Sequence, residues 1–373
     1  MSTLTTPRTP AAISAPGFAQ STWLVAEREI GSKLRSKSFL ISFAIMFAIA
    51  LAAVLWAGFA AGDASGTPVA VTADAQQYVP EDDGALEVTE VADRAAAQAL
   101  VEEGEVEAAI VADASSPTGF TVIAENEVPS SLLLGLAQLP SVELLSPEDA
   151  PNVLGYVAAI GFGIIFLFSA QAFGATIAQS VVEEKQTRVV ELLISAIPVR
   201  ALLAGKVIGN TVLAMGQLLI LAAIAVVGLT VTGQTELAQG LGAPIAWFAV
   251  FFLFGFVLLA SLFAAAAAMV SRQEDIGSTT TPLMMLIMAP YFLVIFFWNT
   301  PVVLGVMSYV PFSAPVGMPM RLFLGDAQWW EPLLSLVVLL ATCVAAIVAG
   351  ARIYENSLLR MGARVKLAEA LKG

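Results

Sequence analysis

The stretch SVVEEKQTRVVELLISAIPVRALLAGKVIGN, residues 180–210, places a charged, helix-forming segment between two long apolar runs. These runs, residues 151–182 and 202–232, each hold the ~20 mainly apolar residues that cross a bilayer core about 30 Å thick. Runs of similar character occupy residues 39–62, 244–271, 276–298 and 332–352. The sequence therefore predicts an α-helical polytopic membrane protein with six transmembrane helices.

The composition agrees with this fold class and narrows the chemistry. Of the 373 residues, 58% are hydrophobic and 13% are charged, whereas a soluble domain carries about 25% charged residues. The chain has no histidine, which excludes histidine acid–base chemistry and zinc–histidine sites. Its one cysteine, Cys343, excludes a disulfide framework. We expect no catalytic, cofactor-binding or metal site, and no nucleic-acid partner.

The distribution of positive charge predicts the orientation of the spans. Of the 17 Lys and Arg residues, all but Arg94 and Arg321 fall before the first span, around the loop after the second, just after the fourth, or at and after the end of the last. Lysine and arginine are enriched in cytoplasmic loops. Both termini are therefore predicted to be cytosolic in a multi-pass plasma-membrane protein, with residues 63–150 outside.

The external region, residues 63–150, holds most of the acidic residues and explains the net charge of −13. Its pattern alternates between β-like runs and one helical run rich in Ala and Glu, which Gly104 is expected to end. This predicts a small extracytoplasmic α/β domain. The strands are expected at residues 68–73, 107–112 and 120–124, and the helix at 91–103.

Two further segments have more than one interpretation. The cytosolic N-terminus, residues 1–38, contains Trp23 and Leu24 among charged residues, which favours an amphipathic helix at the membrane interface over a simple polar flank. Residues 299–331 are apolar but interrupted by prolines. We favour a re-entrant segment in the outer leaflet over an ordinary external loop.

The quoted stretch itself predicts a helix that leaves the membrane and turns back. Glu184 and Arg188 are four residues apart and Arg188 and Glu191 three apart, so they can pair along one helix face. Pro198 is expected to end this helix. A mixed-charge surface with an apolar edge suits contact with a soluble partner, although ordinary loops also carry charged flanks.

The stretch resembles the signature of type-two ABC transporter permeases, in particular the NatB-like branch of sodium-extrusion and multidrug exporters. Three other segments resemble further parts of the family pattern: AEREIGSKLRSK (26–37), SRQED (271–275) and PFSAPVGMPMRLFL (311–324). The matching residues of the signature are Glu183, Glu184, Lys185, Arg188, Glu191, Pro198, Gly205 and Lys206.

The resemblance implies a permease subunit of an ATP-binding cassette exporter, which is not itself an enzyme. It implies two such subunits, identical or different, and a separate ATPase that binds ATP and Mg²⁺, because Gly205-Lys206 lacks the remaining residues of a P-loop. The implied ATPase-coupling residues are Glu183, Glu184, Lys185, Arg188, Glu191, Arg272 and Glu274. The implied segments are the coupling segment 183–201, the cytosolic loop 272–275 and the cytosolic tail 353–373.

The resemblance also implies that the second and fifth spans line the translocation path. Ser169, Gln171 and Gln179 are polar residues in the second span, and they either line this path or bridge packed helices. We find no acidic residue in the middle of a span, which counts against a carboxylate relay for sodium. The substrate, whether sodium, drug, lipid or peptide, stays open.

Two other functional classes fit less well. A secondary transporter is expected to show intramembrane charges or inverted repeats, and we find neither in the sequence. A membrane-anchored sensor with an extracytoplasmic domain would need a cytosolic effector domain, which the tail 353–373 is too short to form.

Overall fold

The computed structural model describes residues 17–62, 67–79, 86–113, 116, 118–124, 153–187, 189–233, 235–358 and 367–372. The chain divides into two compact units. The larger, helical unit comprises Met1–Leu51, Pro151–Val227 and Thr235–Gly373. The smaller unit comprises Ala52–Ala150 and Gly228–Gln234.

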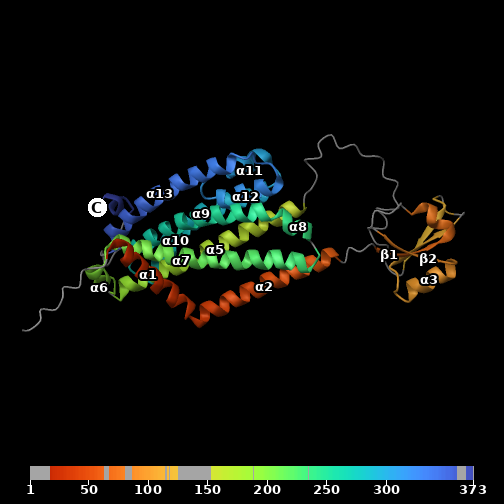
Figure 1. The fold of residues 1–373 in the computed structure, drawn as a ribbon, viewed down its shortest axis with the longest axis horizontal. Helices are drawn as coiled ribbons and strands as arrows, with labels where there is room; N and C mark the ends of the chain where they lie inside the picture. The colour runs from red at the N-terminus through yellow and green to blue at the C-terminus, as the bar shows by residue number, and fades with distance from the viewer. Residues whose placement is uncertain are drawn as a thin grey trace, which may run out of the picture. The chain divides into compact units, whose positions relative to one another are not determined.

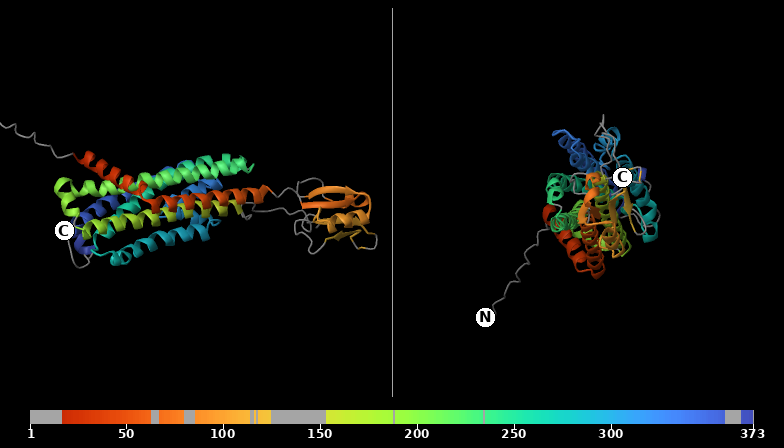
Figure 2. Two further views of the ribbon diagram at one scale, coloured as in Figure 1. Left: turned by 90° about the horizontal axis from the view of Figure 1, so that it is seen from below. Right: turned by 90° about the vertical axis from the view of Figure 1, so that its right-hand side faces the viewer.

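Six long helices confirm the predicted fold class. Each contains a segment long and apolar enough to cross a membrane. In Figures 1 and 2 the helices of the larger unit lie side by side as a bundle. They are α2 (Lys37–Gly62), α5 (Val153–Gln186), α7 (Val199–Val231), α9 (Gly242–Ala268), α10 (Ile276–Phe296) and α13 (Glu331–Leu358).

Shorter helices precede, connect and follow these six. In the part of the chain that the structure describes they are α1 (Phe18–Leu34), α6 (Val189–Ala196), α8 (Thr235–Gly240), the 3-10 turn η3 (Gln273–Asp275), α11 (Pro301–Met307), α12 (Ala314–Leu324) and α14 (Leu367–Lys372). The helix predicted in the N-terminal segment is confirmed as α1, and its position at a membrane interface stays a prediction.

The continuous helix predicted across residues 183–193 is wrong. Helix α5 runs on to Gln186, a turn follows at Thr187, and α6 begins at Val189. The turn lets α6 bury Val190, which is 1% exposed, while Leu192 stays 73% exposed. The predicted pairs of Arg188 lie outside the described residues.

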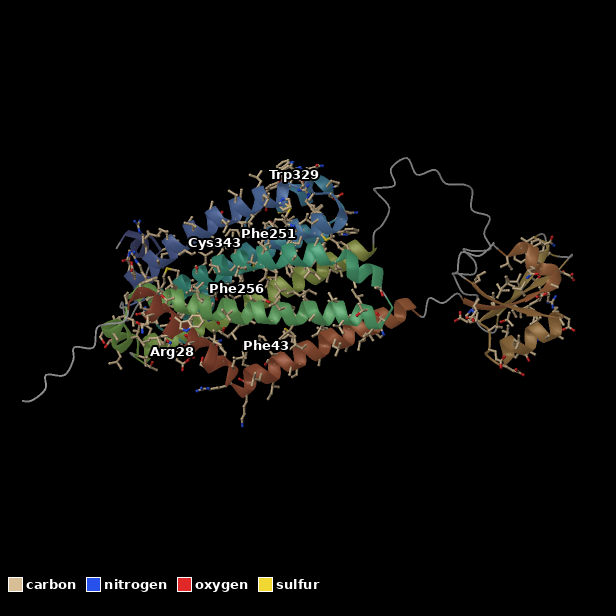
Figure 3. The ribbon with its side chains drawn as sticks, viewed as in Figure 1. Arg28, Phe43, Phe251, Phe256, Trp329 and Cys343 are labelled. Atoms are coloured by element: carbon tan, nitrogen blue, oxygen red, sulfur yellow. The ribbon has the colours of Figure 1, made fainter. Side chains whose placement is uncertain are left out.

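Aromatic side chains on α9 and α5 form the centre of the bundle. The phenylalanines recur every four residues along one face of α9, so that they point toward the same neighbour. Phe256 is one of them and lies among the helices in Figure 3. The ring centroids are 4.8 Å apart for Phe162 and Phe248, 5.9 Å for Phe166 and Phe252, and 5.6 Å for Phe173 and Phe256.

The proline-rich segment folds as the two short helices α11 and α12. Arg321 on α12 donates to both carboxylate oxygens of Glu331 on α13, at 2.9 and 3.1 Å, and Tyr309 donates to the same carboxylate. A Cβ on Gly255 of α9 would lie 2.5 Å from Pro315, which shows how closely α12 approaches the bundle. The segment is therefore packed against the long helices, as a re-entrant segment requires; its depth in a membrane stays a prediction.

The smaller unit is an α/β fold built on a four-stranded sheet. The strands β1 (Thr67–Thr72), β2 (Leu86–Val91), β3 (Ala108–Ala112) and β4 (Phe120–Ile123) pair in the order β2-β1-β3-β4. Strand β1 is parallel to β2 and β3, and β4 is antiparallel to β3. Helix α3 (Arg94–Glu102) contributes to the core on one side of the sheet, and the 3-10 helix η1 (Ala73–Tyr78) to the core on the other.

Three of these strands and the helix agree with the sequence predictions, but β2 was missed. The strand β2 lies at the edge of the sheet, so its acidic middle residues stay largely exposed and the sequence lacks the apolar pattern that predicts a strand. The helix also starts later than predicted, since Asp93 accepts a hydrogen bond from the Ala96 amide at 2.9 Å and caps α3. Gly104 follows α3 with φ +72°, as expected for a helix-ending glycine.

Candidate functional site

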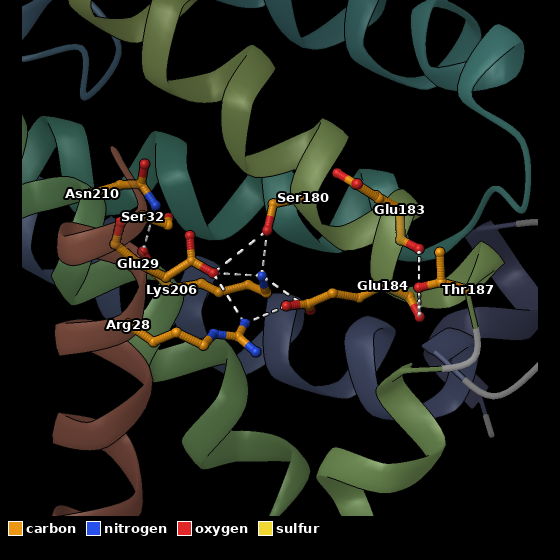
Figure 4. A network of polar contacts seen from close by, with 9 residues as sticks. All are labelled: Arg28, Glu29, Ser32, Ser180, Glu183, Glu184, Thr187, Lys206 and Asn210. Carbon is orange, nitrogen blue, oxygen red and sulfur yellow. Dashed lines mark hydrogen bonds and ion pairs between the residues drawn. The ribbon is translucent and has the colours of Figure 1, made fainter. Parts of the chain in front are cut away.

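A buried lysine near the start of α7 is the centre of a charge cluster. The side chain of Lys206 is 0% exposed. Its ammonium donates to Glu29 Oε1 of α1 at 2.8 Å and to Ser180 Oγ of α5 at 2.6 Å, and it lies 3.0 Å from Glu184 Oε2 of α5 (Figure 4). A buried ammonium is tolerated only when paired and hydrogen-bonded, and these three groups meet that need.

Arg28 of α1 completes the cluster. Its guanidinium pairs with the carboxylate of Glu184 and lies 3.4 Å from that of Glu29. We call Arg28, Glu29, Ser180, Glu184 and Lys206 the Lys206 cluster. Its two cations and two carboxylates balance, so the burial leaves no net charge. The cluster fixes α1 to both α5 and α7.

The environment of Glu29 keeps its carboxylate ionised. Burial alone would raise the pKa of Glu29, but the charge of Lys206 and then that of Arg28 outweigh burial and lower the pKa below its ordinary value of 4.5. A carboxylate with a depressed pKa stabilises the folded state above its unfolded pKa, and this contribution disappears as the pH falls through the folded pKa.

We therefore expect the melting temperature of the protein to fall as the pH drops below about 4.5, the ordinary pKa of Glu29. Thermal unfolding in detergent between pH 7 and pH 3 measures this dependence. The Glu29→Gln variant should melt lower at neutral pH and lose less on acidification. Parallel pH profiles for the two proteins would contradict the assignment.

Two glycines explain how α1 comes so close to α7. A Cβ on Gly205 would lie 2.4 Å from the Cβ of Val25 and 2.7 Å from the carbonyl oxygen of Thr22. A Cβ on Gly209, one turn later, would lie 3.0 Å from the carbonyl oxygen of Ala26. Small residues four apart allow helix backbones to approach closely. The glycine-lysine pair of the quoted stretch thus has two roles, close contact by Gly205 and ion pairing by Lys206.

Lys185, the neighbour of Glu184, joins α5 to two other helices. Its buried ammonium donates to the carbonyl oxygen of Ala268 at 2.8 Å and to that of Ser357 at 2.9 Å. These carbonyls lie at the C-terminal ends of α9 and α13, where unpaired carbonyls favour a cation. Consecutive residues in the last turn of α5 therefore hold α5 to α1 and α7 through Glu184, and to α9 and α13 through Lys185.

The remaining predicted coupling residues lie on the surface. Glu183 and Glu191 are exposed, and Arg272 pairs with Glu274 at 3.2 Å, with both side chains more than 70% exposed. Arg188 lies outside the described residues. The structure thus separates the predicted set into buried Lys185, half-buried Glu184 and four exposed residues. Sequence reasoning did not identify Arg28 and Glu29 as partners of Lys206, although both lie in the segment AEREIGSKLRSK that resembles the family pattern.

Two of the three residues predicted for the path share a groove. Gln171 and Gln179 line a groove of about 60 Å³ between α5 and α10. Ser169 does not line it: it is buried and donates to the carbonyl oxygen of Ile165 at 2.7 Å, within its own helix. The other lining residues are Ala175, Phe263, Ile276, Thr280 and Met284. Among the described residues, no group of three His, Cys, Asp or Glu side chains could hold a metal ion.

The model of the ABC-2 family transporter proteins matches residues 37–352 of the chain. The chain belongs to this family. The chain is accordingly a multi-pass membrane protein of a transporter family. The match runs from the start of α2 into α13, which continues to Leu358, and it includes the glycine, lysine and glutamate positions described above on α5 and α7.

Two curated relatives share about a quarter of the aligned residues with the chain. "Uncharacterized protein YhaP" of Bacillus subtilis is 26% identical over 229 residues, which cover 58% of the chain and 54% of the relative. "Uncharacterized protein MJ1024" of Methanocaldococcus jannaschii is 24% identical over 230 residues, which cover 60% and 55%. The chain spans about half the length of these relatives. No solved structure matches it.

Proposed function

We propose that the chain is the permease subunit of an ATP-binding cassette exporter that moves its substrate outward with energy from a separate ATPase. The observation that carries this proposal is the last turn of α5. There, Glu184 and Lys185 connect the turn before α6 to α1, α7, α9 and α13. A force applied to this turn reaches four other helices through buried polar contacts.

The ATPase contact is proposed to lie on exposed residues beside this turn. Glu183, Glu191 and Leu192 provide acidic groups with an apolar side chain, and Arg272 and Glu274 provide a second charged loop. Glu184 and Lys185 then act as internal coupling residues, because Lys185 is buried and Glu184 is already paired with Arg28 and Lys206. Arg188 is proposed to belong to the same contact.

The remaining features of the transporter follow the family pattern. We place both termini in the cytosol of a plasma-membrane protein and residues 63–150 outside. A second permease subunit, identical or different, completes the path along Gln171 and Gln179. ATP and Mg²⁺ bind to the ATPase and no cofactor binds to this chain. The NatB-like branch, with sodium or drug efflux, is one version of this function; lipid or peptide export are others.

Reversing the exposed charges should separate the permease from its ATPase. We expect the double variant Glu183→Lys/Glu191→Lys to lose co-purification with the cassette ATPase that the wild-type chain captures, while it still inserts into the membrane. Neither side chain is buried, so the fold should persist; Glu184 is unsuitable because its reversal would break the Lys206 cluster.

The matched control is Glu105→Lys, an exposed acid in the smaller unit, which should leave the complex intact. Membrane insertion is measured by fractionation and folding by the melting temperature. Unchanged ATPase capture by the double variant would refute the proposed contact. Failure of the wild-type chain to capture any cassette ATPase would refute the proposed function.

A further inference from the structure

The groove between α5 and α10 has a regular construction. Gln171, Ala175 and Gln179 follow at intervals of four residues along α5, and Ile276, Thr280 and Met284 do so along α10. Side chains four apart lie on one helix face, so two such rows form the walls, and Phe263 of α9 also lines the groove. The groove is therefore an elongated strip along the helices.

Polar groups occur at separate levels of this strip. Gln171 and Gln179 are eight residues apart, which is about 12 Å along a helix axis. Both side chains are exposed, and neither amide hydrogen-bonds to any residue that the structure describes. Unpaired amides at membrane depth are costly. Their donors and acceptors are available to a ligand. The rest of the lining is Ala175, Phe263, Ile276, Met284 and Thr280, and the Thr280 hydroxyl already donates to the Ile276 carbonyl oxygen at 3.0 Å.

The chemistry of the seven lining residues selects against charged ligands. None of them carries a charge, so an ion in the groove would lose hydration without a compensating opposite charge. A metal ion also needs several oxygen ligands within about 2.6 Å. Amides about 12 Å apart cannot surround a single ion. An extended molecule with hydrogen-bonding groups at both ends and an apolar middle fits both constraints.

We propose that this groove binds an uncharged, elongated amphiphile whose polar groups lie about 12 Å apart. The proposal rests on the exporter function, because a groove of about 60 Å³ is one wall of a site and the second permease subunit supplies the other. Ligand pockets usually enclose about 300–1,000 Å³. The substrate class is therefore a neutral amphiphile, which disfavours the sodium version of the proposed function.

Photolabelling of the full chain in lipid nanodiscs, without the ATPase, tests the ligand class. The probe is an α,ω-alkanediol with hydroxyls about 12 Å apart and a diazirine at its centre. The matched probes are the α,ω-diammonium of equal length and a diol of half that length. We expect saturable labelling of the α5 and α10 groove residues by the long diol, and about tenfold weaker half-saturation for the other two.

Substitution of the glutamines tests the two polar levels. Gln171→Leu and Gln179→Leu should each weaken labelling by about fivefold, the effect of losing one hydrogen bond. Gln217→Leu is the matched control, because Gln217 is a glutamine in another span and contacts Met46 of α2 instead. Equal labelling by the diammonium, retention of radioactive sodium that Gln179→Leu abolishes, or full labelling of both glutamine variants would overturn the proposal.

The outcome is independent of the ATPase contact. Saturable labelling by the long diol in a chain that captures no ATPase would support the ligand class and refute the exporter function. ATPase capture by a chain that the long diol does not label would refute the ligand class and leave the exporter function standing.

Discussion

The Lys206→Met variant is expected to lose about 3–5 kcal/mol of unfolding free energy, the cost of removing one partner of a buried ion pair. Methionine fills a similar volume but leaves the carboxylates of Glu29 and Glu184 next to an apolar chain. Glu29 is 6% and Glu184 13% exposed, so water cannot replace the lost ammonium. The melting temperature of the purified protein in detergent measures the change.

A triple variant separates the lost charge balance from a lost contact. Replacing buried charges together by neutral groups is often neutral for stability, and Arg28, which stays charged, is 42% exposed and keeps access to water. The variant Lys206→Met/Glu29→Gln/Glu184→Gln should therefore recover most of the melting temperature. It should still weaken coupling between ATPase activity and transport, because α1 is no longer held by ions. If the Lys206→Met variant melts like the wild type, Lys206 is not the partner of Glu29 and Glu184.

The Gly205→Ala variant is expected to destabilise the protein by about 1–3 kcal/mol, as overpacking of a close contact does. The added methyl group would lie 2.4 Å from the Cβ of Val25, and a backbone oxygen, Thr22 O, lies 2.7 Å away and cannot rotate aside. Helix α1 must therefore move, which also lengthens the pairs of Glu29 and Arg28. Melting temperature and tryptic cleavage within α1 measure the two consequences.

Gly216→Ala is the matched control on the same helix. A Cβ at Gly216 meets nothing within 4 Å, and alanine favours a helix by about 0.8–1.0 kcal/mol relative to glycine. We expect unchanged or higher stability and no new cleavage in α1. Equal melting temperatures and cleavage patterns for the two variants would show that α1 does not depend on Gly205.

Span number and fold class could be predicted because each span is a long apolar run, a signal that needs no knowledge of neighbours. The ends of the helices could not be predicted in this way. The helical spacing of Glu184, Arg188 and Glu191 predicts one continuous helix, whereas α5 ends at Gln186 and α6 begins at Val189. The carbonyl partners of Lys185, in the last turn of α5, lie 83 and 172 positions away, where no local pattern reveals them.

In the candidate site, too, some features could be predicted from the local sequence and others depend on distant residues. The resemblance identified Glu184, Lys185, Gly205 and Lys206, but spacing within the stretch suggested that Glu184 pairs with Arg188. Its partner Arg28 is 156 residues distant in sequence, beyond the reach of any local pattern. The groove was partly predictable, because glutamines in an apolar run are conspicuous, whereas Thr280 and Met284 join them only through the packing of α10 on α5.

The order of synthesis determines when each of the two buried lysines, Lys206 and Lys185, can meet its partners. Glu29, Ser180 and Glu184 all leave the ribosome before Lys206, so this lysine meets its partners as soon as α7 inserts. Lys185 instead waits for Ala268 and then for Ser357, which is made 172 residues later. The ammonium of Lys185 therefore has both acceptors only after α13 enters the membrane. During biogenesis, the contact of α5 with α9 and α13 forms after the Lys206 cluster.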